Sequence, residues 1–202
     1  MPRPGETTGD SILDAASRRY ERFGPRKTTM SEVAREAGFS RATVYCHFPS
    51  KEALYTGLLE RETRSFIEEI EAVAASTREA SGKLAAILAT TTRVYSERKV
   101  LCGALVGDDD MVLERAAAPV VRAYEDRVMH VLRGVLDEGV VEGSLREVDT
   151  QAVAYLMFQL GQGLVLREVT GRADFAFERI LGAMNDLLAS GIVAQRPAKE
   201  NP

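Results

Sequence analysis

The 202-residue sequence has little of what several classes of protein require. No apolar run approaches the roughly 18 residues that a membrane-spanning helix needs. The first residues, MPRPGETTGDS, contain no apolar core of a signal peptide, so we expect a cytoplasmic protein. The two cysteines, Cys46 and Cys102, fit a reducing compartment better than a disulfide framework.

The patterns on which many catalytic and cofactor sites depend are also missing. The chain has no nucleotide-binding glycine loop, and its two histidines, His47 and His130, are too few for most Ser/His/Asp or Cys/His sites. The three aspartates at 108–110 lack the alternating spacing and the glycine of a calcium loop, so we interpret them as the acidic start of a helix. We therefore expect no catalytic site, no metal and no cofactor. An enzyme with an unrecognised site is the alternative from another class.

Strand-like alternation and internal repeats are absent, and apolar residues recur instead at helical spacing. This periodicity predicts an all-α protein of about nine helices. Thr8 is predicted to cap the first helix, and Pro119 is predicted to begin the helix that ends at Glu138. The segment 100–107 is apolar and punctuated by glycine. The expected helices span residues 8–23, 30–37, 41–48, 51–77, 82–98, 119–138, 150–170 and 174–190, with a further short one after the aspartates.

Residues 28–51, TTMSEVAREAGFSRATVYCHFPSK, carry the strongest local signals. Thr29 and Glu32 have the spacing of a capping box at the start of one helix. Gly38 follows the end of that helix, where a left-handed residue is favoured. Ser40 can cap a second helix, which ends before a proline. Two short helices joined by a tight turn predict a helix-turn-helix, which places its second helix in the DNA major groove.

The second helix should turn Val44 and Phe48 inward and its other side chains outward. Outward-facing guanidinium, hydroxyl, phenol and imidazole groups can bond base edges and phosphates. Lys51 follows the cap Ser50, at a helix start where a phosphate would meet both the cation and free N–H groups. A plain solvent-exposed helical hairpin is the alternative. The predicted DNA-binding residues are Lys27, Thr28, Thr29, Ser31, Ser40, Arg41, Ala42, Thr43, Tyr45, His47 and Lys51.

The net charge of −4 does not by itself indicate a nucleic-acid-binding protein, but its distribution does. Residues 1–51 hold nine Lys and Arg against six Asp and Glu, a net charge of +3. The remainder holds 17 against 24, a net charge of −7. A positive N-terminal part on an acidic body directs one end of the molecule toward a polyanion.

The run ILDAA…RKTTMSEVAREAGFSRATVYCHFPSKEALY resembles the N-terminal domain of TetR-type bacterial transcriptional regulators. Within it, the pattern A-x-x-A-G-x-S-x-x-T-x-Y-x-x-F-x-x-K-x-x-L occurs without gaps. The resemblance covers residues 8–58, about a quarter of the chain, and the remainder carries no motif of its own. It implies a homodimer, a C-terminal effector pocket and release from DNA when the effector binds.

The C-terminal half independently offers surfaces for self-association. The helix expected over 150–170 is apolar on more than one face, and the one over 174–190 is amphipathic. Two such pairs can form a four-helix interface between two copies of the chain. The predicted interface residues are Leu156, Leu160, Gly163, Leu164, Phe177, Ile180, Leu181, Met184 and Leu188.

We predict a helix-turn-helix domain over residues 8–52 and an effector-binding and dimerisation domain over 53–192. The helix over 51–77 joins them without a Gly/Ser linker, so motion in one should be felt by the other. A mostly apolar pocket with few polar anchors favours a hydrophobic or amphipathic effector. A dimer presents two recognition helices, so we expect a palindromic operator. An activator and a ligand-independent DNA-binding protein are the alternatives to a repressor. The predicted pocket residues are Leu88, Thr91, Tyr95, Leu105, Tyr124, Tyr155, Phe158, Gln159 and Gln162.

Overall fold

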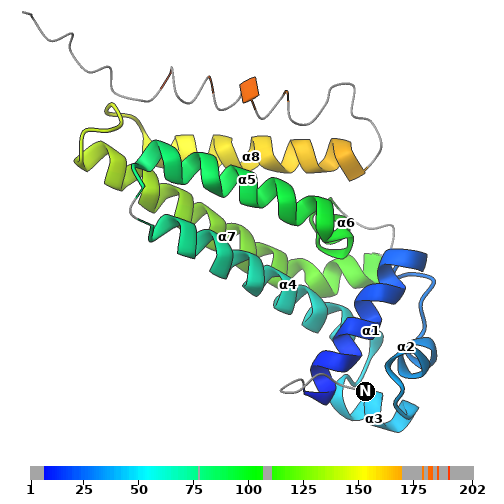
Figure 1. The fold of residues 1–202 in the computed structure, drawn as a ribbon. Coiled ribbons are helices and arrows are strands. Elements are labelled where there is room, and N and C mark those ends of the chain that lie inside the picture. Colours follow the sequence, from blue (N-terminus) through cyan, green and yellow to red (C-terminus); the bar gives the residue numbers. More distant parts are fainter. Residues whose placement is uncertain are drawn as a thin grey trace, which may run out of the picture. The chain divides into compact units, whose positions relative to one another are not determined.

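The computed structural model describes residues 7–76, 78–106 and 111–169, with isolated positions beyond them. Every regular element in this part of the chain is helical, which confirms the all-α prediction (Figure 1). The ninth helix predicted over 174–190 and the aspartates at 108–110 lie outside the described residues, apart from single helical positions such as Arg179. The helices are α1 (Thr8–Phe23), α2 (Met30–Ala37), α3 (Arg41–His47), α4 (Lys51–Ala74), α5 (Ala80–Glu97), α6 (Lys99–Val106), α7 (Met111–Val141) and α8 (Thr150–Val169).

The chain divides into two compact units, and α4, α5 and α7 contribute to both. Unit 1 contains Met1–Ser65 and Tyr95–Glu125, so it holds α1, α2, α3, α6, the first parts of α4 and α7 and the end of α5. Unit 2 contains Phe66–Val94 and Asp126–Pro202. The sequence-based division at residue 52 falls at the start of α4, whereas this division falls inside that helix.

The core of unit 1 is built on the apolar stripe of α1. Ile12, Ala16 and Tyr20 are buried, and the ring of Tyr20 meets that of Tyr55 on α4 edge to face at a centroid distance of 5.9 Å. Phe23 keeps the same helical spacing, but it is 40% exposed. The guanidinium groups of Arg19 and Arg22 lie over its ring, at 4.2 and 5.0 Å from the centroid.

Helix α1 begins one residue earlier than predicted. Thr7, not Thr8, is the N-cap: its hydroxyl accepts a hydrogen bond from the Asp10 N–H, and the Asp10 carboxylate accepts one from the Thr7 N–H. The reason is the acid three residues after Thr7, which completes a capping box that Thr8 cannot form.

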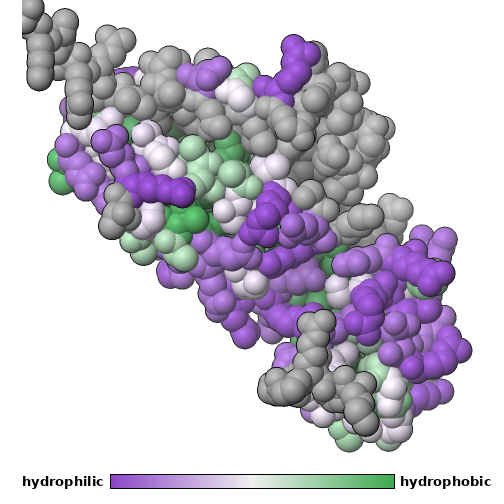
Figure 2. Space-filling model, viewed as in Figure 1, coloured by the Kyte–Doolittle hydropathy of each residue, from purple (hydrophilic) through white to green (hydrophobic). Residues whose placement is uncertain are grey.

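On the face seen in Figure 2, hydrophilic residues predominate over α1 and α2.

Pro119 does not begin a helix. It lies inside α7, which starts at Met111, and the apolar segment at 100–107 forms α6. A proline within a helix costs one backbone hydrogen bond and roughly 3 kcal/mol. The buried side chains of Leu113, Ala117 and Tyr124 keep helical spacing across the proline, whose own side chain is exposed. Burial of these side chains therefore outweighs the unfavourable helix propensity of Pro119.

Unit 2 is held together by apolar stripes on α5, α7 and α8 and by polar contacts between helices. The side chain of Lys83 on α5 is only 5% exposed, and its Nζ donates to both carboxylate oxygens of Glu138 on α7 at 2.6 and 2.7 Å. Helix α7 comes close to its neighbours at Gly139, where a Cβ atom would lie 2.5 Å from Ala80 Cβ and 2.6 Å from a Leu145 methyl. No helix among the described residues is long and apolar enough to cross a membrane.

Candidate nucleic-acid interface

The start and end of α2 follow the signals in the sequence. Thr29 Oγ1 accepts from the Glu32 N–H at 3.3 Å, and Glu32 Oε2 accepts from the Thr29 N–H at 2.8 Å, so the predicted capping box is present. These bonds hold the pKa of Glu32 below its usual range, and the nearby cations Arg19 and Arg35 act in the same direction. Gly38 ends the helix with φ 74° and ψ 20°, the left-handed conformation.

Helix α3 is positioned by a cap at one end and a buried side chain in the middle. Ser40 Oγ accepts from the Thr43 N–H at 3.0 Å, as predicted. Val44 is fully buried, and α3 packs on α2 through this side. The helix ends at His47, and Phe48 follows as its C-cap instead of its last residue. Two short helices and a tight turn between them thus form a helix-turn-helix.

Helix α3 carries five of the eleven residues that the sequence predicts to contact DNA. Arg41, Ala42, Tyr45 and His47 are exposed, and Thr43 is half-buried. Cys46 is exposed as well, although it was not among the predicted contacts. Its spacing of four residues from Ala42 places the two on one side of the helix, so the sequence contained the signal.

The starts of α2 and α4 lie beside the turn that follows α1. Ser50 Oγ accepts from the Ala53 N–H at 3.1 Å and caps α4. Lys51 Nζ donates to the carbonyl oxygen of Arg26 at 3.0 Å, which joins the first turn of α4 to this turn. Arg26, Lys27, Thr29 and Ser40 are exposed, and Ser31 is half-buried.

Thr28 differs from the other predicted DNA-binding residues. It is only 1% exposed, and its hydroxyl donates to the carbonyl oxygen of Gly24 at 3.0 Å. Gly24 itself has a φ of 78° and ends α1. The Thr28 hydroxyl therefore stabilises the turn that follows α1.

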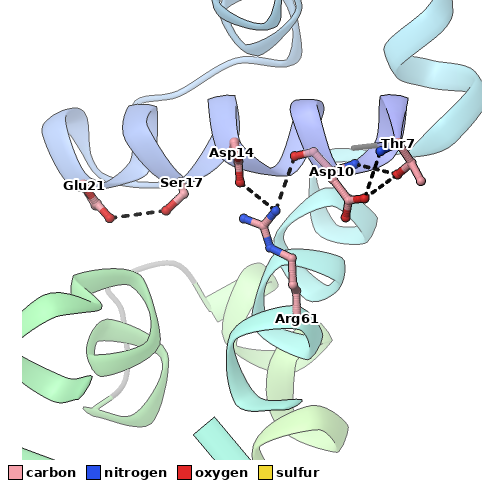
Figure 3. A network of polar contacts seen from close by, with 6 residues as sticks. All are labelled: Thr7, Asp10, Asp14, Ser17, Glu21 and Arg61. Atoms are coloured by element: carbon pink, nitrogen blue, oxygen red, sulfur yellow. Dashed lines mark hydrogen bonds and ion pairs between the residues drawn. The ribbon is translucent and has the colours of Figure 1, made fainter. Parts of the chain in front are cut away.

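A guanidinium on α4 holds the N-terminal part of α1. Arg61 Nη1 lies 2.7 Å from Asp14 Oδ1 and donates to the carbonyl oxygen of Asp10 at 3.3 Å (Figure 3). A Cβ atom at Gly9 would lie 3.8 Å from His47 Nδ1, so the first turn of α1 runs close to the end of α3. The hydroxyl and the N–H of Thr7 both donate to the Asp10 carboxylate, and these two bonds lower the pKa of Asp10. The contact between Arg61 and α1 thus helps to set where the end of α3 lies.

The residues predicted for the pocket are distributed over both units. Leu88 and Phe158 of unit 2 and Tyr124 of unit 1 are buried. Thr91 and Gln162 are half-buried, whereas Tyr155 and Gln159 are exposed on α8. The backbones of Tyr95 and Leu105 are helical, in α5 and α6.

The residues predicted for self-association lie on α8 or beyond it. Leu156, Leu160 and Gly163 are exposed, and Leu156 and Leu160 keep 59% and 54% of their surface in the single chain. Ala154, Met157 and Phe158 on the other side of α8 are buried. Leu164 is in the helix, but Phe177, Ile180, Leu181, Met184 and Leu188 lie outside the described residues.

An exposed polar second helix, capped helix starts and an adjacent lysine define a helix-turn-helix protein of the DNA-binding class. Residues 12–58 match the family model described as bacterial regulatory proteins, tetR family. This match and the similarity to HTH-type transcriptional regulators support a transcriptional regulator of the TetR family.

Similar proteins extend the likeness beyond the helix-turn-helix. An uncharacterised HTH-type transcriptional regulator of Mycobacterium tuberculosis is 35% identical over 127 residues, which cover 57% of this chain and 63% of that relative. The structure of Bacillus subtilis FadR in complex with stearoyl-CoA is similar with a TM-score of 0.74, at 22% identity over 90% of this chain and 97% of that one. A TetR transcription regulator of Haloarcula marismortui has a TM-score of 0.81, at 21% identity over 92% and 98%. The two solved structures support the fold alone.

Proposed function

We propose that this protein is a ligand-responsive transcriptional regulator, a repressor that binds a palindromic DNA operator as a homodimer in the cytoplasm. The observation that carries the proposal is the exposed face of α3, where Arg41, Tyr45 and His47 project from a helix anchored by the buried Val44. Guanidinium and imidazole groups at this position can reach base edges in the major groove. The exposed Lys27 and Thr29 and the start of α4 at Lys51 supply phosphate contacts.

The exposed apolar side of α8 supports the dimer. Leu156 and Leu160 are four residues apart, so they form a stripe on one side of the helix. A second copy of the chain would cover this stripe in a two-fold symmetric contact. Two copies present two α3 helices, which fit half-sites about 34–36 Å apart on one side of the DNA.

The effector is a small hydrophobic or amphipathic molecule. Leu88 and Phe158 of unit 2 are buried apolar side chains of the kind that line a pocket for such a ligand. The similarity to a regulator solved with stearoyl-CoA favours an acyl-CoA as the first probe. Binding of an effector raises thermal stability by mass action, whereas a ligand-independent DNA-binding protein shows no such shift.

Release from DNA follows from the continuity of α4, which runs through both units without a proline. The effector can favour release only through its different affinity for the DNA-binding and released states. Reciprocity then requires operator DNA to weaken effector binding by the same factor. Equal affinities for stearoyl-CoA with and without operator, once binding is detected, would refute this coupling.

Selection of bound fragments from a genomic library tests the function directly. The expected result is enrichment of one palindromic sequence, which full-length protein protects from nuclease digestion. A variant with Arg41, Tyr45 and His47 all changed to Ala keeps the buried anchor Val44 and should enrich no sequence. If wild type and this variant recover the same fragments, α3 is not the reading helix. An operator upstream of a promoter that the protein stimulates would favour the activator instead.

A further inference from the structure

Glu62 on α4 is a buried acidic residue in the same unit as the helix-turn-helix. Its residue surface is 9% exposed, and its Oε2 atom is buried without a hydrogen-bond partner among the described residues. A buried charged oxygen that lacks a donor costs free energy. None of the proposed DNA, effector or dimer contacts uses this carboxylate.

The side chain lies where α4 meets the start of α6. Arg98 directly precedes α6, and its Nη1 donates to the Glu62 carbonyl oxygen at 2.8 Å while its Nη2 donates to Ser65 Oγ at 3.2 Å. The N–H of Leu101, in the first turn of α6, acts on the Glu62 carboxylate as a hydrogen-bond donor. Cys102 beside it is 1% exposed. Glu62 therefore belongs to the contact through which α4 holds α6.

Helix α6 in turn packs against α1, the helix that supports α2 and the end of α3. All of these elements belong to unit 1. A displacement of α6 from α4 would therefore remove one of the supports of α1. A change in the charge of Glu62 acts directly on this support.

The electrostatic surroundings of Glu62 come from three helices. Burial raises the pKa of Glu62 above its usual range, and the carboxylate of Glu21 on α1 adds to the rise. The cations Arg98 and Arg61 and the N–H of Leu101 oppose it without cancelling it. Burial, followed by the charge of Glu62, raises the pKa of the Cys102 thiol to about 12, so this neighbour stays neutral at physiological pH.

Because the pKa of Glu62 is raised, the stability of the contact between α4 and α6 depends on pH. A carboxyl whose pKa is raised in one conformation binds its proton more tightly there than in water. The described contact between α4 and α6 is therefore stabilised by protonation of Glu62. This contribution is fully present below the ordinary carboxyl pKa, and it is lost as the pH rises through the raised pKa.

We propose that Glu62 is a proton-dependent latch between α4 and α6 and regulates the helix-turn-helix through α1. With Glu62 protonated, α6 is held against α4 and α1 as described. With Glu62 ionised, states in which α6 separates from α4 and the carboxylate reaches water gain population. The regulatory part of this proposal rests on the proposed function in DNA binding, whereas the latch itself does not.

Hydrogen exchange of the α6 amides in full-length protein tests the latch. The comparison uses wild type, Glu62→Gln and the control Glu60→Gln at pH 5 and pH 8, with each rate corrected for the intrinsic pH dependence of exchange. Glu60 is exposed on the same helix, two residues earlier. A difference of one in the Glu62 pKa between the closed and open states of the contact would change their equilibrium by about tenfold. For such a difference, Glu62→Gln should slow exchange at pH 8 by up to about tenfold. At pH 5 the difference should shrink, and Glu60→Gln should match wild type at both.

Equal exchange in wild type and Glu62→Gln at pH 8, or the same slowing in Glu60→Gln, would overturn the latch. If Glu62→Gln does not fold, the wild type alone decides, because its corrected α6 protection should fall between pH 5 and pH 8. An unchanged protection then counts against the proposal.

Binding of selected operator DNA at the same two pH values tests the regulation. Wild type and Glu62→Gln both retain every residue proposed to contact DNA, so these contacts contribute equally to both. The expected result is a different pH dependence of the operator Kd in Glu62→Gln, with Glu60→Gln following wild type. If Glu62→Gln shows the expected slower exchange but wild type binds no DNA, the latch stands and the proposed function is refuted. Normal DNA binding with identical pH profiles in all three proteins would refute the regulation by Glu62.

Discussion

The ammonium group of Lys51 donates to the carbonyl oxygen of Arg26 at 3.0 Å, which ties the first turn of α4 to the turn between α1 and α2. This contact joins two segments that are 25 residues apart, and both belong to the surface proposed to face DNA. A lysine ammonium carries three protons, so a bond to one carbonyl leaves two for a phosphate. Lys51 can thus position the turn and bind the DNA backbone at once.

Lys51→Ala should weaken binding to operator and to unrelated DNA by the same factor, because phosphate contacts position a protein without reading sequence. The slope of log K against log salt concentration should become less steep by about 0.9, because the variant neutralises one phosphate fewer. Fluorescence anisotropy with both DNAs over a salt series measures each quantity. Lys51→Arg keeps the charge and serves as the control. A weakening confined to the operator would instead give Lys51 a role in base recognition.

Arg41→Ala should act on sequence preference. Arg41 is exposed at the first position of α3, where a bidentate contact to guanine is worth roughly 1–3 kcal/mol of discrimination. Selection of binding sites from a random pool should lose the preference at one base pair of each half-site. Arg35→Ala, which removes an exposed arginine from the end of α2, is the control. An unchanged preference in Arg41→Ala would leave Arg41 as a backbone contact at most.

The helix-turn-helix could be predicted from the sequence because its signals are local. The capping box at Thr29, the left-handed Gly38 and the cap Ser40 each act within four residues, and all three occur in the structure. Thr28 is among the predicted DNA-binding residues, yet it is buried and its hydroxyl donates to the Gly24 carbonyl oxygen. That outcome depends on how the turn after α1 closes, which the local pattern does not specify.

Features that depend on tertiary packing were the ones that the sequence did not reveal. Pro119 reads locally as a helix start, but the buried stripe from Leu113 to Tyr124 carries α7 through it. The burial of Glu62 against the start of α6 depends on Arg98, 36 residues away. Helical periodicity assigns residues to faces of a helix, but it does not say which helix will cover a given face.

Gly38 and Gly134 offer a matched pair of substitutions. At Gly38 a Cβ atom would meet nothing within 4 Å, but φ is 74°, so Gly38→Ala should destabilise the protein by roughly 1 kcal/mol through backbone strain alone. Gly134 lies exposed inside α7 with equally open space and no positive φ, so Gly134→Ala should stabilise by about 0.5–1 kcal/mol. Urea denaturation at pH 7 measures both. Shifts of the same sign would show that space, not conformation, governs these positions.

The capping box at α2 should make stability depend on acid. Hydrogen bonds from Thr29 lower the pKa of Glu32, so the stabilisation is present above the ordinary carboxyl pKa and is lost as the pH falls through the lowered value. Glu32→Gln should therefore lower the Tm at pH 7, and its difference from wild type should diminish toward pH 3. Thermal unfolding followed by circular dichroism at several pH values measures this. Glu60→Gln, on the exposed side of α4, should show no such trend, and a similar trend there would point to net charge as the cause.

A charge on the exposed side of α8 should separate the dimer. Leu160 is 54% exposed in the single chain. In Leu160→Glu, formation of the proposed dimer would bury an unpaired carboxylate in an apolar contact. Light scattering should give the mass of one chain for Leu160→Glu and of two for wild type, while helicity by circular dichroism stays the same. Val141→Glu is the control, because Val141 is 88% exposed at the end of α7, outside the proposed interface. The monomer should also lose operator binding, since one α3 alone reads one half-site. If Leu160→Glu remains a dimer with the dissociation constant of wild type, the interface lies on a surface other than this side of α8.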